Sequence, residues 1–432
     1  MSFDPKNLLV DLFHTAVAAA DPEKVLPGYL GKLLTELATK KDQGDVVIIG
    51  AGKAAASMAA ALEKHWVCSE GDLSSLRGLV VTAYGHAVPC KQIEVIEAAH
   101  PVPDHRSEIA AQRILKTVSS LNKNDLVICL LSGGGSSLLA LPALGITLAD
   151  KQQINQALLE SGAAIGEINC VRKHLSAIKG GRLAAACLPA KLVTFAISDV
   201  PGDDPAVIAS GPTVADPTTR LQSLKILKKY QIKISGGVKQ WLDNPDGETP
   251  KMVCESSEFL IIATAQHSLL AAARQAEEQG LTALVLGDDL TGKSRVLARS
   301  HAELISHVLE RGQPVNAPCV LLSGGETTVK VRGRGRGGRN TEYLLSLAAQ
   351  LQGRANVYAL AADTDGIDGP GDNAGAVLLP DSWPRAKALG LNVVTMLENN
   401  DSYRFFEMLD DLVITGPTHT NVNDFRAILV LP

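Results

Sequence analysis

The chain has 432 residues, which is too long for one ordinary hydrophobic core and favours two or three domains. Hydrophobic residues make up 46% of the sequence and charged residues 20%, which is typical of a soluble globular protein. The formal net charge of −5 and an aromatic content of 4% argue against a nucleic-acid-binding surface over the whole molecule. No run of about 18 apolar residues occurs, so we expect no membrane span.

Seven cysteines are scattered along the chain without a CxxC pair or the spacing of a metal finger. An odd, scattered set in a long chain favours reduced thiols. Cys129 and Cys319 lie in apolar runs, so we expect both to be buried. Residues 1–11 include acidic side chains and lack the apolar core of a secretory signal. We therefore expect a cytoplasmic protein.

Strand-like and helix-like segments alternate along the first half of the chain. A helix is expected over residues 7–20, an alanine-rich helix from 53 to about 64, and another helix over 107–120. The expected strands cover residues 45–49, 78–83, 126–131 and 191–198. This alternation predicts a mostly parallel sheet with helices on both faces.

Turn-forming residues gather over 235–237 and 244–250, which is where we predict a linker. The chain is therefore divided into an N-terminal domain over 1–240 and a second α/β domain over 251–432. Strands of the second domain are expected over 258–263, 282–286, 318–322, 356–361 and 411–414.

Two glycine segments of similar sequence each follow an apolar run: LSGGGSS at 131–137 and LSGGETT at 322–328. Glycines allow positive φ and a close approach of backbone N–H groups to a ligand, and a following helix N-terminus favours negative charge. The alternative is that both are ordinary glycine turns. The residues that we expect to bind anionic groups here are Ser132, Gly133, Gly134, Gly135, Ser136, Ser137, Gly324, Gly325 and Glu326.

The segment GAGKAA at 50–55 satisfies the loose dinucleotide pattern GxGxxA, so a dehydrogenase must be considered. A dinucleotide site needs a carboxylate at the end of the next strand for the ribose, and the strand over 78–83 ends without one. Gly52 allows the turn, and the ammonium of Lys53 suits a transferring phosphoryl group better than a hydride acceptor. Alternatively, Lys53 is a solvated lysine beside a tight turn.

Basic residues gather over 172–174 and again in the Lys-Gly-Gly-Arg turn over 179–182. Arg172 can hold a carboxylate through two hydrogen bonds, and Lys173 adds a second positive charge. A basic run on a helix is more commonly a solvated face.

Carboxylates follow the strand over 191–198, at the edge of the sheet where open α/β sheets bind ligands. Asp199 or Asp204 can take a proton from a substrate hydroxyl or bind magnesium. Turn formation alone also favours these aspartates.

An arginine–glycine loop over 331–339 precedes a helical pattern over 341–351. Arginine–glycine repeats that bind RNA are long and disordered, whereas this loop is short and lies just after the second glycine segment. A loop covering phosphates fits better, with Arg339 nearest the helix and Asn340 beside it.

Four aspartates lie on the glycine-rich segment over 362–375, and the spacing is not that of an EF-hand. We expect Asp363 and Asp365 to hold Mg²⁺ together with substrate phosphates. Small polar residues over 415–424 follow one more strand, and among them Asn421 is expected to contact the substrate, while His419 is also consistent with a surface histidine.

These segments together resemble the class II glycerate kinases, the glycerate 2-kinase group whose C-terminal part is called the MOFRL domain. The resemblance covers essentially the whole chain, with the MOFRL region at about 315–425. It rests on GAGKAA at 50–55, LLSGGGSSLL at 130–139, NCVRKHLSAIKGGRLA at 169–184, SDVPGDDPAVIASGPT at 198–213, LLSGGETTV at 321–329, GRGGRNTE at 335–342, ADTDGIDGPGDNAGA at 362–376 and GPTHTNVND at 416–424.

The resemblance implies transfer of the γ-phosphoryl group of ATP, with Mg²⁺, to the 2-hydroxyl of D-glycerate. It also implies a Rossmann-like N-terminal domain, a smaller C-terminal α/β domain and an active site in the cleft between them. Lys53 and Arg339 match the family's lysine and arginine that are implicated in activity. We expect small-molecule substrates, no nucleic-acid or membrane partner, and a monomer or homodimer. The alternatives are an NAD(P)H-dependent hydroxypyruvate reductase and a non-catalytic sensor of a phosphorylated metabolite.

Overall fold

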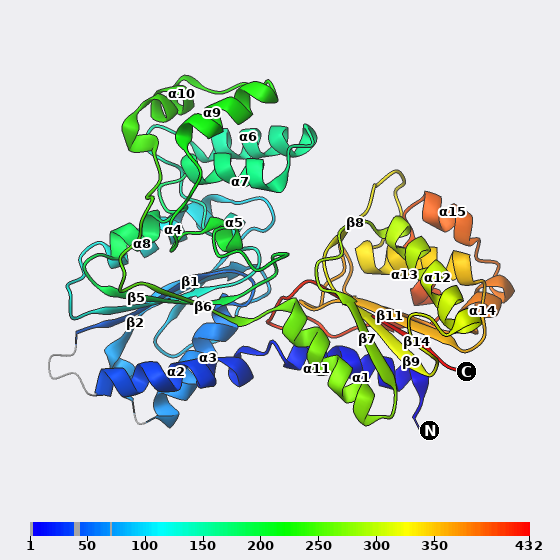
Figure 1. Ribbon diagram of the computed structural model, residues 1–432. Coiled ribbons are helices and arrows are strands. Elements are labelled where there is room, and N and C mark those ends of the chain that lie inside the picture. Colours follow the sequence, from blue (N-terminus) through cyan, green and yellow to red (C-terminus); the bar gives the residue numbers. More distant parts are fainter. Residues whose placement is uncertain (1–2, 39–43, 70) are drawn as a thin grey trace. The chain divides into compact units, whose positions relative to one another are not determined.

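The computed structural model describes residues 3–38, 44–69 and 71–432, and the chain divides into two compact units. The terminal unit contains Met1–Asp21 and Ala263–Pro432, and the inserted unit contains Pro22–Ile262 (Figure 1). Each unit is built around one six-stranded sheet. The α/β class with two domains is therefore confirmed.

The inserted unit contains a sheet with the strand order β3-β2-β1-β4-β5-β6. Its strands are β1 (Val46–Ala51), β2 (Leu76–Ala83), β3 (Glu94–Ala98), β4 (Leu126–Leu131), β5 (Lys191–Ile197) and β6 (Glu258–Ala263). The pairings from β3 through β5 are all parallel. This is the order of dinucleotide-binding folds, and its direction reverses between β1 and β4, the position at which such sheets bind ligands.

Helices of the inserted unit form two groups. Close to the sheet lie α2 (Pro22–Ala38), α3 (Ala55–Cys68), α4 (His105–Val118), α5 (Gly135–Leu138) and α8 (Arg182–Cys187). A separate group contains α6 (Leu148–Glu160), α7 (Ile165–His174), α9 (Arg220–Lys229) and α10 (Gly236–Asp243), at the top of the unit in Figure 1. This second group has its own apolar cluster, which includes Ile154, Leu158 and Val171.

The terminal unit contains a mixed sheet with the strand order β13-β12-β11-β14-β9-β7. Its strands are β7 (Thr282–Gly287), β9 (Cys319–Ser323), β11 (Val357–Asp363), β12 (Gly375–Leu378), β13 (Leu412–Val413) and β14 (Asp424–Val430). The pairing of β7 with β9 is parallel, and the other pairings are antiparallel. A short parallel pair joins β8 (Gly292–Lys293) to β10 (Thr327–Thr328).

Helices cover both faces of this second sheet. One face is covered by α1 (Pro5–Ala18) and α11 (Ala265–Glu278). The other is covered by α12 (Ser294–Arg311), α13 (Arg339–Leu351), α14 (Ser382–Ala388), α15 (Val393–Glu398) and α16 (Ser402–Met408). As the apolar runs predict, Cys129 and Cys319 are buried in the two sheets, and all seven cysteines are free thiols.

The structure differs from the predicted domain ranges at three places. Helix α1 packs on the terminal unit, and the strand expected to begin the second domain is β6, at the edge of the first sheet. The expected linker over 235–250 contains α10 and a short 3₁₀ turn within the inserted unit. The apolar stripe of a helix shows that it is buried, but not against which sheet, and turn formers occur inside domains as well as between them.

Candidate active site

The loops that follow β1 and β4 are tied together at the point where the strand order reverses. The backbone N–H of Lys53 donates to the carbonyl oxygen of Gly133 at 2.8 Å, and the N–H of Ala54 donates to Ser132 Oγ at 2.9 Å. Gly52, with φ of 141°, has no room for a Cβ, which would fall on the Ser132 hydroxyl. Ser132 and Gly133 therefore hold the two loops in register.

The first glycine segment has the predicted form of strand, glycine turn and short helix. Gly134 has φ of 80° and is followed by α5. A Cβ on Gly134 would lie 3.5 Å from Lys53 Cγ, so the stem of Lys53 passes beside this turn. Ser136 Oγ lies 2.8 Å from Ser210 Oγ, and Ser137 Oγ donates to the carbonyl oxygen of Pro101 at 2.6 Å.

A pocket of about 500 Å³ opens beside these two serines, within the inserted unit. Its volume is in the range of small-molecule sites. Apolar contacts come from Pro101, Val102, Pro103, Ala140 and Ala157. Polar side chains come from Ser136, Ser137, Lys151, Gln152, Gln153, Asn155, Gln156, Glu160, Arg172 and Lys179.

Three of these polar residues are cationic. Arg172 Nε donates to Asn155 Oδ1 at 2.6 Å, and burial lowers the pKa of its guanidinium. Lys151 Nζ lies 3.4 Å from the carbonyl oxygen of Leu141, and Lys179 Nζ lies 3.5 Å from that of Ala209. Among the residues that the structure describes, no carboxylate forms an ion pair with any of the three. They are therefore available to an anionic ligand.

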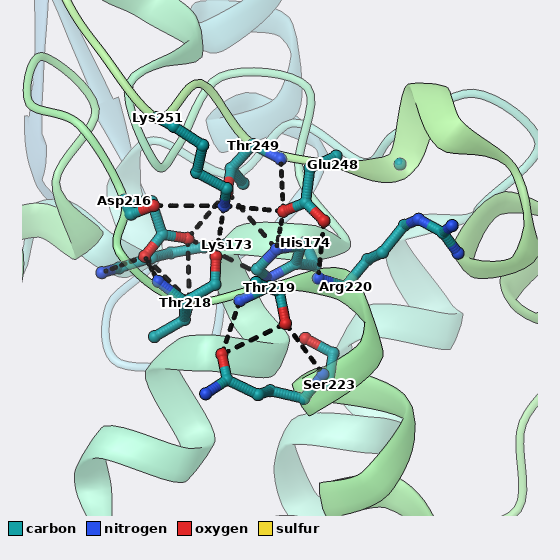
Figure 2. A network of polar contacts seen from close by, with 12 residues as sticks. Lys173, His174, Asp216, Thr218, Thr219, Arg220, Ser223, Glu248, Thr249 and Lys251 are labelled. Carbon is teal, nitrogen blue, oxygen red and sulfur yellow. Dashed lines mark hydrogen bonds and ion pairs between the residues drawn. The ribbon is translucent and has the colours of Figure 1, made fainter.

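Lys173 follows Arg172 on α7 but contacts a different set of residues (Figure 2). Its ammonium lies 3.3 Å from Asp216 Oδ1, and both side chains are almost fully buried. Asp216 also accepts hydrogen bonds from Thr218 Oγ1 at 2.8 Å and Thr249 Oγ1 at 3.0 Å. Lys173 thus neutralises Asp216 and anchors α7, and it does not line the pocket, so its placement gives no support to the predicted contact with substrate.

Asp199 and Asp204 follow β5, as predicted. Asp199 is half-buried, and Asp204 is exposed. The Asp204 carboxylate accepts a hydrogen bond from the N–H of Ala206 at 2.8 Å, and its carbonyl oxygen accepts one from Val207 at 2.9 Å. Asp204 therefore stabilises the turn that follows β5.

The second glycine segment, in the terminal unit, does not have the predicted form. Gly325 has φ of 91°, but the chain continues into strand β10 rather than into a helix. The carbonyl oxygen of Gly324 accepts a hydrogen bond from Arg426 at 2.9 Å. Two β-branched threonines, Thr327 and Thr328, follow this turn and favour a strand, which explains the difference from the first segment.

Arg339 lies at the centre of a cluster of carboxylates in the terminal unit. Its guanidinium donates to Asp424 at 2.7 Å, to Glu326 at 2.6 Å and to Asp363 at 2.7 Å. Burial alone would lower the pKa of Arg339, but the three carboxylates outweigh burial and raise it. The arginine is therefore always charged. Asp424 is also bonded to the buried Arg426 and, at 2.7 Å, to the Asn340 amide.

Asp363 and Asp365 belong to this part of the unit, but their contacts are those of a folded loop. Asp363 Oδ2 accepts from Arg339 and its Oδ1 accepts from the N–H of Asp365 at 3.1 Å. Asp365 Oδ1 accepts from the N–H of Ile367 at 2.9 Å. In residues 3–38, 44–69 and 71–432, no group of three or more His, Cys, Asp or Glu side chains is arranged to hold a metal ion. Binding of Mg²⁺ by these two aspartates stays a prediction.

Asn421 is buried, and its Oδ1 accepts a hydrogen bond from the N–H of Asn423 at 3.1 Å. It thus shapes the loop before β14 in the structure.

Sequence reasoning missed Lys151, Asp424 and Arg426. Lys151 lies on an amphipathic helix in which nothing distinguishes it from a surface lysine. Asp424 and Arg426 lie in a strand that is otherwise apolar. Two residues of opposite charge in such a strand indicate a buried ion pair, and this signal was present in the sequence.

Models of two protein families match the chain: the "Domain of unknown function (DUF4147)" over residues 8–243 and the "MOFRL family" over residues 319–424. A protein of Agrobacterium vitis named "Putative hydroxypyruvate reductase" is 50% identical over 98% of this chain and 94% of its own length. The D-glycerate 2-kinase of Thermotoga maritima is 41% identical over 99% of this chain and 100% of its own.

A crystal structure described as the glycerate kinase of Thermotoga maritima superposes with a TM-score of 0.87 at 40% identity, covering 99% of both chains. No helix in the described part of the chain is long and apolar enough to cross a membrane. Two family models in sequence and relatives aligned from end to end, with glycerate kinases among them, lead to one conclusion: the chain belongs to the class II glycerate kinase family, the glycerate 2-kinase group with a MOFRL domain.

Proposed function

We propose that the protein is an ATP-dependent kinase that phosphorylates the 2-hydroxyl of D-glycerate, giving 2-phosphoglycerate and ADP. Membership of the family over the full length supports this activity. The observation that carries the proposal is the pocket of the inserted unit, which Arg172, Lys151 and Lys179 line together with two serines, and among the described residues no carboxylate forms an ion pair with these three cations. Such a pocket suits a small, hydroxylated anion.

The carboxylate of glycerate binds Arg172 in this proposal. A planar guanidinium can donate two parallel hydrogen bonds to a carboxylate, which fixes the position of the adjacent carbon and its hydroxyl. Asn155 Oδ1 accepts from Nε at 2.6 Å, and Nη1 donates to Asn169 Oδ1 over a longer distance of 3.4 Å, a contact that a carboxylate of the ligand can replace. The hydroxyls of Ser136 and Ser137 lie on the same pocket and are suited to the hydroxyl groups of the substrate.

In the reaction, the 2-hydroxyl oxygen bonds to the γ-phosphorus as the bond from that phosphorus to the β–γ bridging oxygen breaks. The hydroxyl proton passes to a carboxylate, for which Asp199 and Asp204 are the candidates. Phosphoryl transfer depends mainly on positioning and on neutralising charge. Lys53, whose stem lies beside Gly134, supplies a positive charge for the transferred phosphoryl group.

Magnesium, when bound, neutralises the nucleotide phosphates. We assign it to Asp363 and Asp365 only as a prediction, since the oxygens of Asp363 already accept hydrogen bonds from Arg339 and Asp365.

Arg339 is assigned to catalysis by the family resemblance, and in the structure its guanidinium is occupied by three carboxylates. A phosphate group must replace at least one of them. Glu326 is the one suited to leave, because its side chain is 52% exposed and water can solvate it, whereas Asp424 and Asp363 are buried.

The direct test is to incubate the purified protein with D-glycerate, ATP and Mg²⁺ and to record the phosphorus NMR spectrum. A 2-phosphoglycerate signal that grows with ADP is the expected result, and it also identifies the hydroxyl attacked. Only 3-phosphoglycerate, or no phosphoester from well-folded protein, would contradict the proposal.

The two assigned cations are tested separately. Lys53→Met and Arg339→Ala should each lower kcat/KM by about 100-fold or more, the size expected for losing a group that stabilises transition-state charge. Lys239→Met is the matched control, because Lys239 is exposed and pairs with Asp243 on the same helix, α10. If both variants remained within a few-fold of wild type, these roles would be wrong.

The reductase alternative takes its support from the name of the 50% identical relative. Two features of the structure argue against the reductase alternative. The N–H groups of Lys53 and Ala54, which a dinucleotide phosphate would need, are bonded to Gly133 and Ser132. No carboxylate follows β2 directly. Oxidation of NADH by hydroxypyruvate in the absence of kinase turnover would favour the reductase, and tight metabolite binding without either turnover would favour a sensor.

A further inference from the structure

The cationic pocket holds more positive charge than the carboxylate of glycerate requires. Glycerate carries a single negative charge, and Arg172 alone can match it. Lys151 and Lys179 add two further ammonium groups on the same pocket, while the exposed Glu160, which accepts a hydrogen bond from Gln156, brings one negative charge to its lining. Burying a cation is costly unless an opposite charge accompanies it, so two surplus lysines call for a second anionic group in the ligand.

The charges of the two lysines and of Arg172 act on one another, and among the described residues no carboxylate forms an ion pair with either lysine. Lys179 is 2% exposed, and its pKa is lowered by burial first and then by the charges of Lys151 and Arg172. Burial lowers the pKa of Lys151 to about 7, with a further contribution from Arg172, while Glu108 on α4 opposes the shift. Both shifts make the ammonium form of each lysine less favourable than it is in water.

The charges of the three cations match those of a phosphorylated hydroxy acid. A phosphate monoester carries about −1.5 to −2 at neutral pH and a carboxylate carries −1, so 2-phosphoglycerate has nearly the charge needed to balance Arg172, Lys151 and Lys179. A compact ammonium on a flexible stem suits a phosphoryl oxygen, whereas the planar guanidinium suits the carboxylate.

We propose that Lys151 and Lys179 form a phosphoryl-binding subsite beside Arg172, so that the pocket binds the phosphorylated hydroxy acid more tightly than the hydroxy acid itself. This inference rests on the proposed kinase function for the identity of its ligand. It also implies that a lysine of the subsite takes up a proton when the ligand binds. Below its pKa Lys151 is already charged, and above it binding must include proton uptake by this lysine, so affinity falls as the pH rises past 7.

The test is calorimetric titration of 2-phosphoglycerate and of D-glycerate, without nucleotide, into wild type, Lys151→Met, Lys179→Met and the control Lys239→Met. Each pocket variant should weaken 2-phosphoglycerate binding by about 10- to 100-fold and change glycerate binding by less than about threefold. Titrations at pH 8 in two buffers of different ionisation enthalpy should show proton uptake in wild type and less uptake in Lys151→Met. Lys151→Met should fold, since it replaces a half-buried cation by an apolar side chain of similar length.

Three outcomes would overturn the subsite: unchanged affinity for 2-phosphoglycerate, equal losses for both ligands, or binding of 2-hydroxymalonate as tight as that of 2-phosphoglycerate. The last would show that the lysines accept a second carboxylate. The inference and the kinase proposal fail separately. Turnover with no effect of the lysines would refute only the subsite, and lysine-dependent binding of 2-phosphoglycerate without turnover would refute only the kinase.

Discussion

Gly52 lies where the loops that follow β1 and β4 are in contact, and no side chain fits there. Its φ of 141° is rarely adopted by other residues, and a Cβ would meet the side chain and backbone of Ser132. We predict that Gly52→Ala destabilises the inserted unit by about 3 kcal/mol or more, because strain and overlap add. Thermal unfolding measures this, with Gly31→Ala as the control.

Gly31 lies within α2 and has no positive φ, and no atom lies within 4 Å of the place that an alanine methyl group would take there. Gly31→Ala should therefore stabilise the protein by about 0.5–1 kcal/mol, since alanine is the better helix former. Equal effects of the two substitutions would contradict the steric account of Gly52.

Glu248 gives a pH-dependent contribution to stability. Partial burial tends to raise its pKa, but hydrogen bonds from Lys251, His174 and the N–H of Arg220 lower it to about 2 (Figure 2). Since the pKa in the unfolded chain is about 4.3, the stabilisation is present above that value and is lost as the pH falls toward 2. The Tm difference between wild type and Glu248→Gln should be largest near pH 6 and shrink by pH 3.

The exposed Glu255 provides a control for this measurement, and Glu255→Gln should show no such trend. A Tm difference for Glu248→Gln that stayed constant from pH 6 to pH 3 would show that the carboxylate contributes through packing rather than through its charge.

Helix α13 depends on one buried carboxylate at its N-terminus. Asp368 accepts hydrogen bonds from the N–H groups of Asn340 and Thr341, both at 2.9 Å, and from Thr341 Oγ1 at 2.8 Å. We predict that Asp368→Ala costs about 1–3 kcal/mol, because buried donors lose their acceptor. Urea unfolding of the terminal unit measures this cost.

Asp368→Asn separates the charge from the hydrogen bonds. Burial raises the pKa of Asp368, so the folded state holds its proton more tightly than the unfolded state does, and stability falls as the pH rises through the folded pKa. Asp368→Asn should remove that fall and cost less than Asp368→Ala at neutral pH. A larger loss with asparagine than with alanine would contradict this role.

At the level of elements, the sequence was most informative where apolar runs are continuous. The predicted strands over 126–131 and 258–263 coincide with β4 and β6. The edge strand β3 was missed because it is short and acidic residues at 94 and 97 interrupt its apolar residues, and β14 was missed because charged residues begin it. The site follows the same logic: Arg172 lies in a recognisable basic run, whereas Lys151 reaches the pocket only because α6 packs beside α7.

On the scale of the whole molecule, α1 belongs to the terminal unit, although the 241 residues of the inserted unit, 22–262, separate it in sequence from the rest of that unit. Its buried side chains Leu8, Leu9, Leu12 and Phe13 pack with α11 on the sheet of the terminal unit. We predict that Phe13→Ala destabilises this unit by about 3–5 kcal/mol. Hydrogen exchange should therefore speed up in β11 and β14 and stay unchanged in β1 and β4.

Leu62→Ala is the matched control, because Leu62 is fully buried on α3 of the inserted unit. It should speed exchange in β1 and β4 and leave β11 and β14 as they are. Faster exchange across both sheets with either variant would mean that the two units unfold as one.

The discontinuity of the terminal unit also bears on how the protein is made. A ribosome that has synthesised α1 must continue through the inserted unit and on to β14 before the sheet that buries α1 is complete. At a synthesis rate of about 5–20 residues per second, the apolar face of α1 stays unburied for roughly 20–80 seconds. The inserted unit can fold during that interval. The apolar face of α1 therefore stays without its packing partners while residues 22–262 are synthesised, which makes α1 a segment for chaperones to bind.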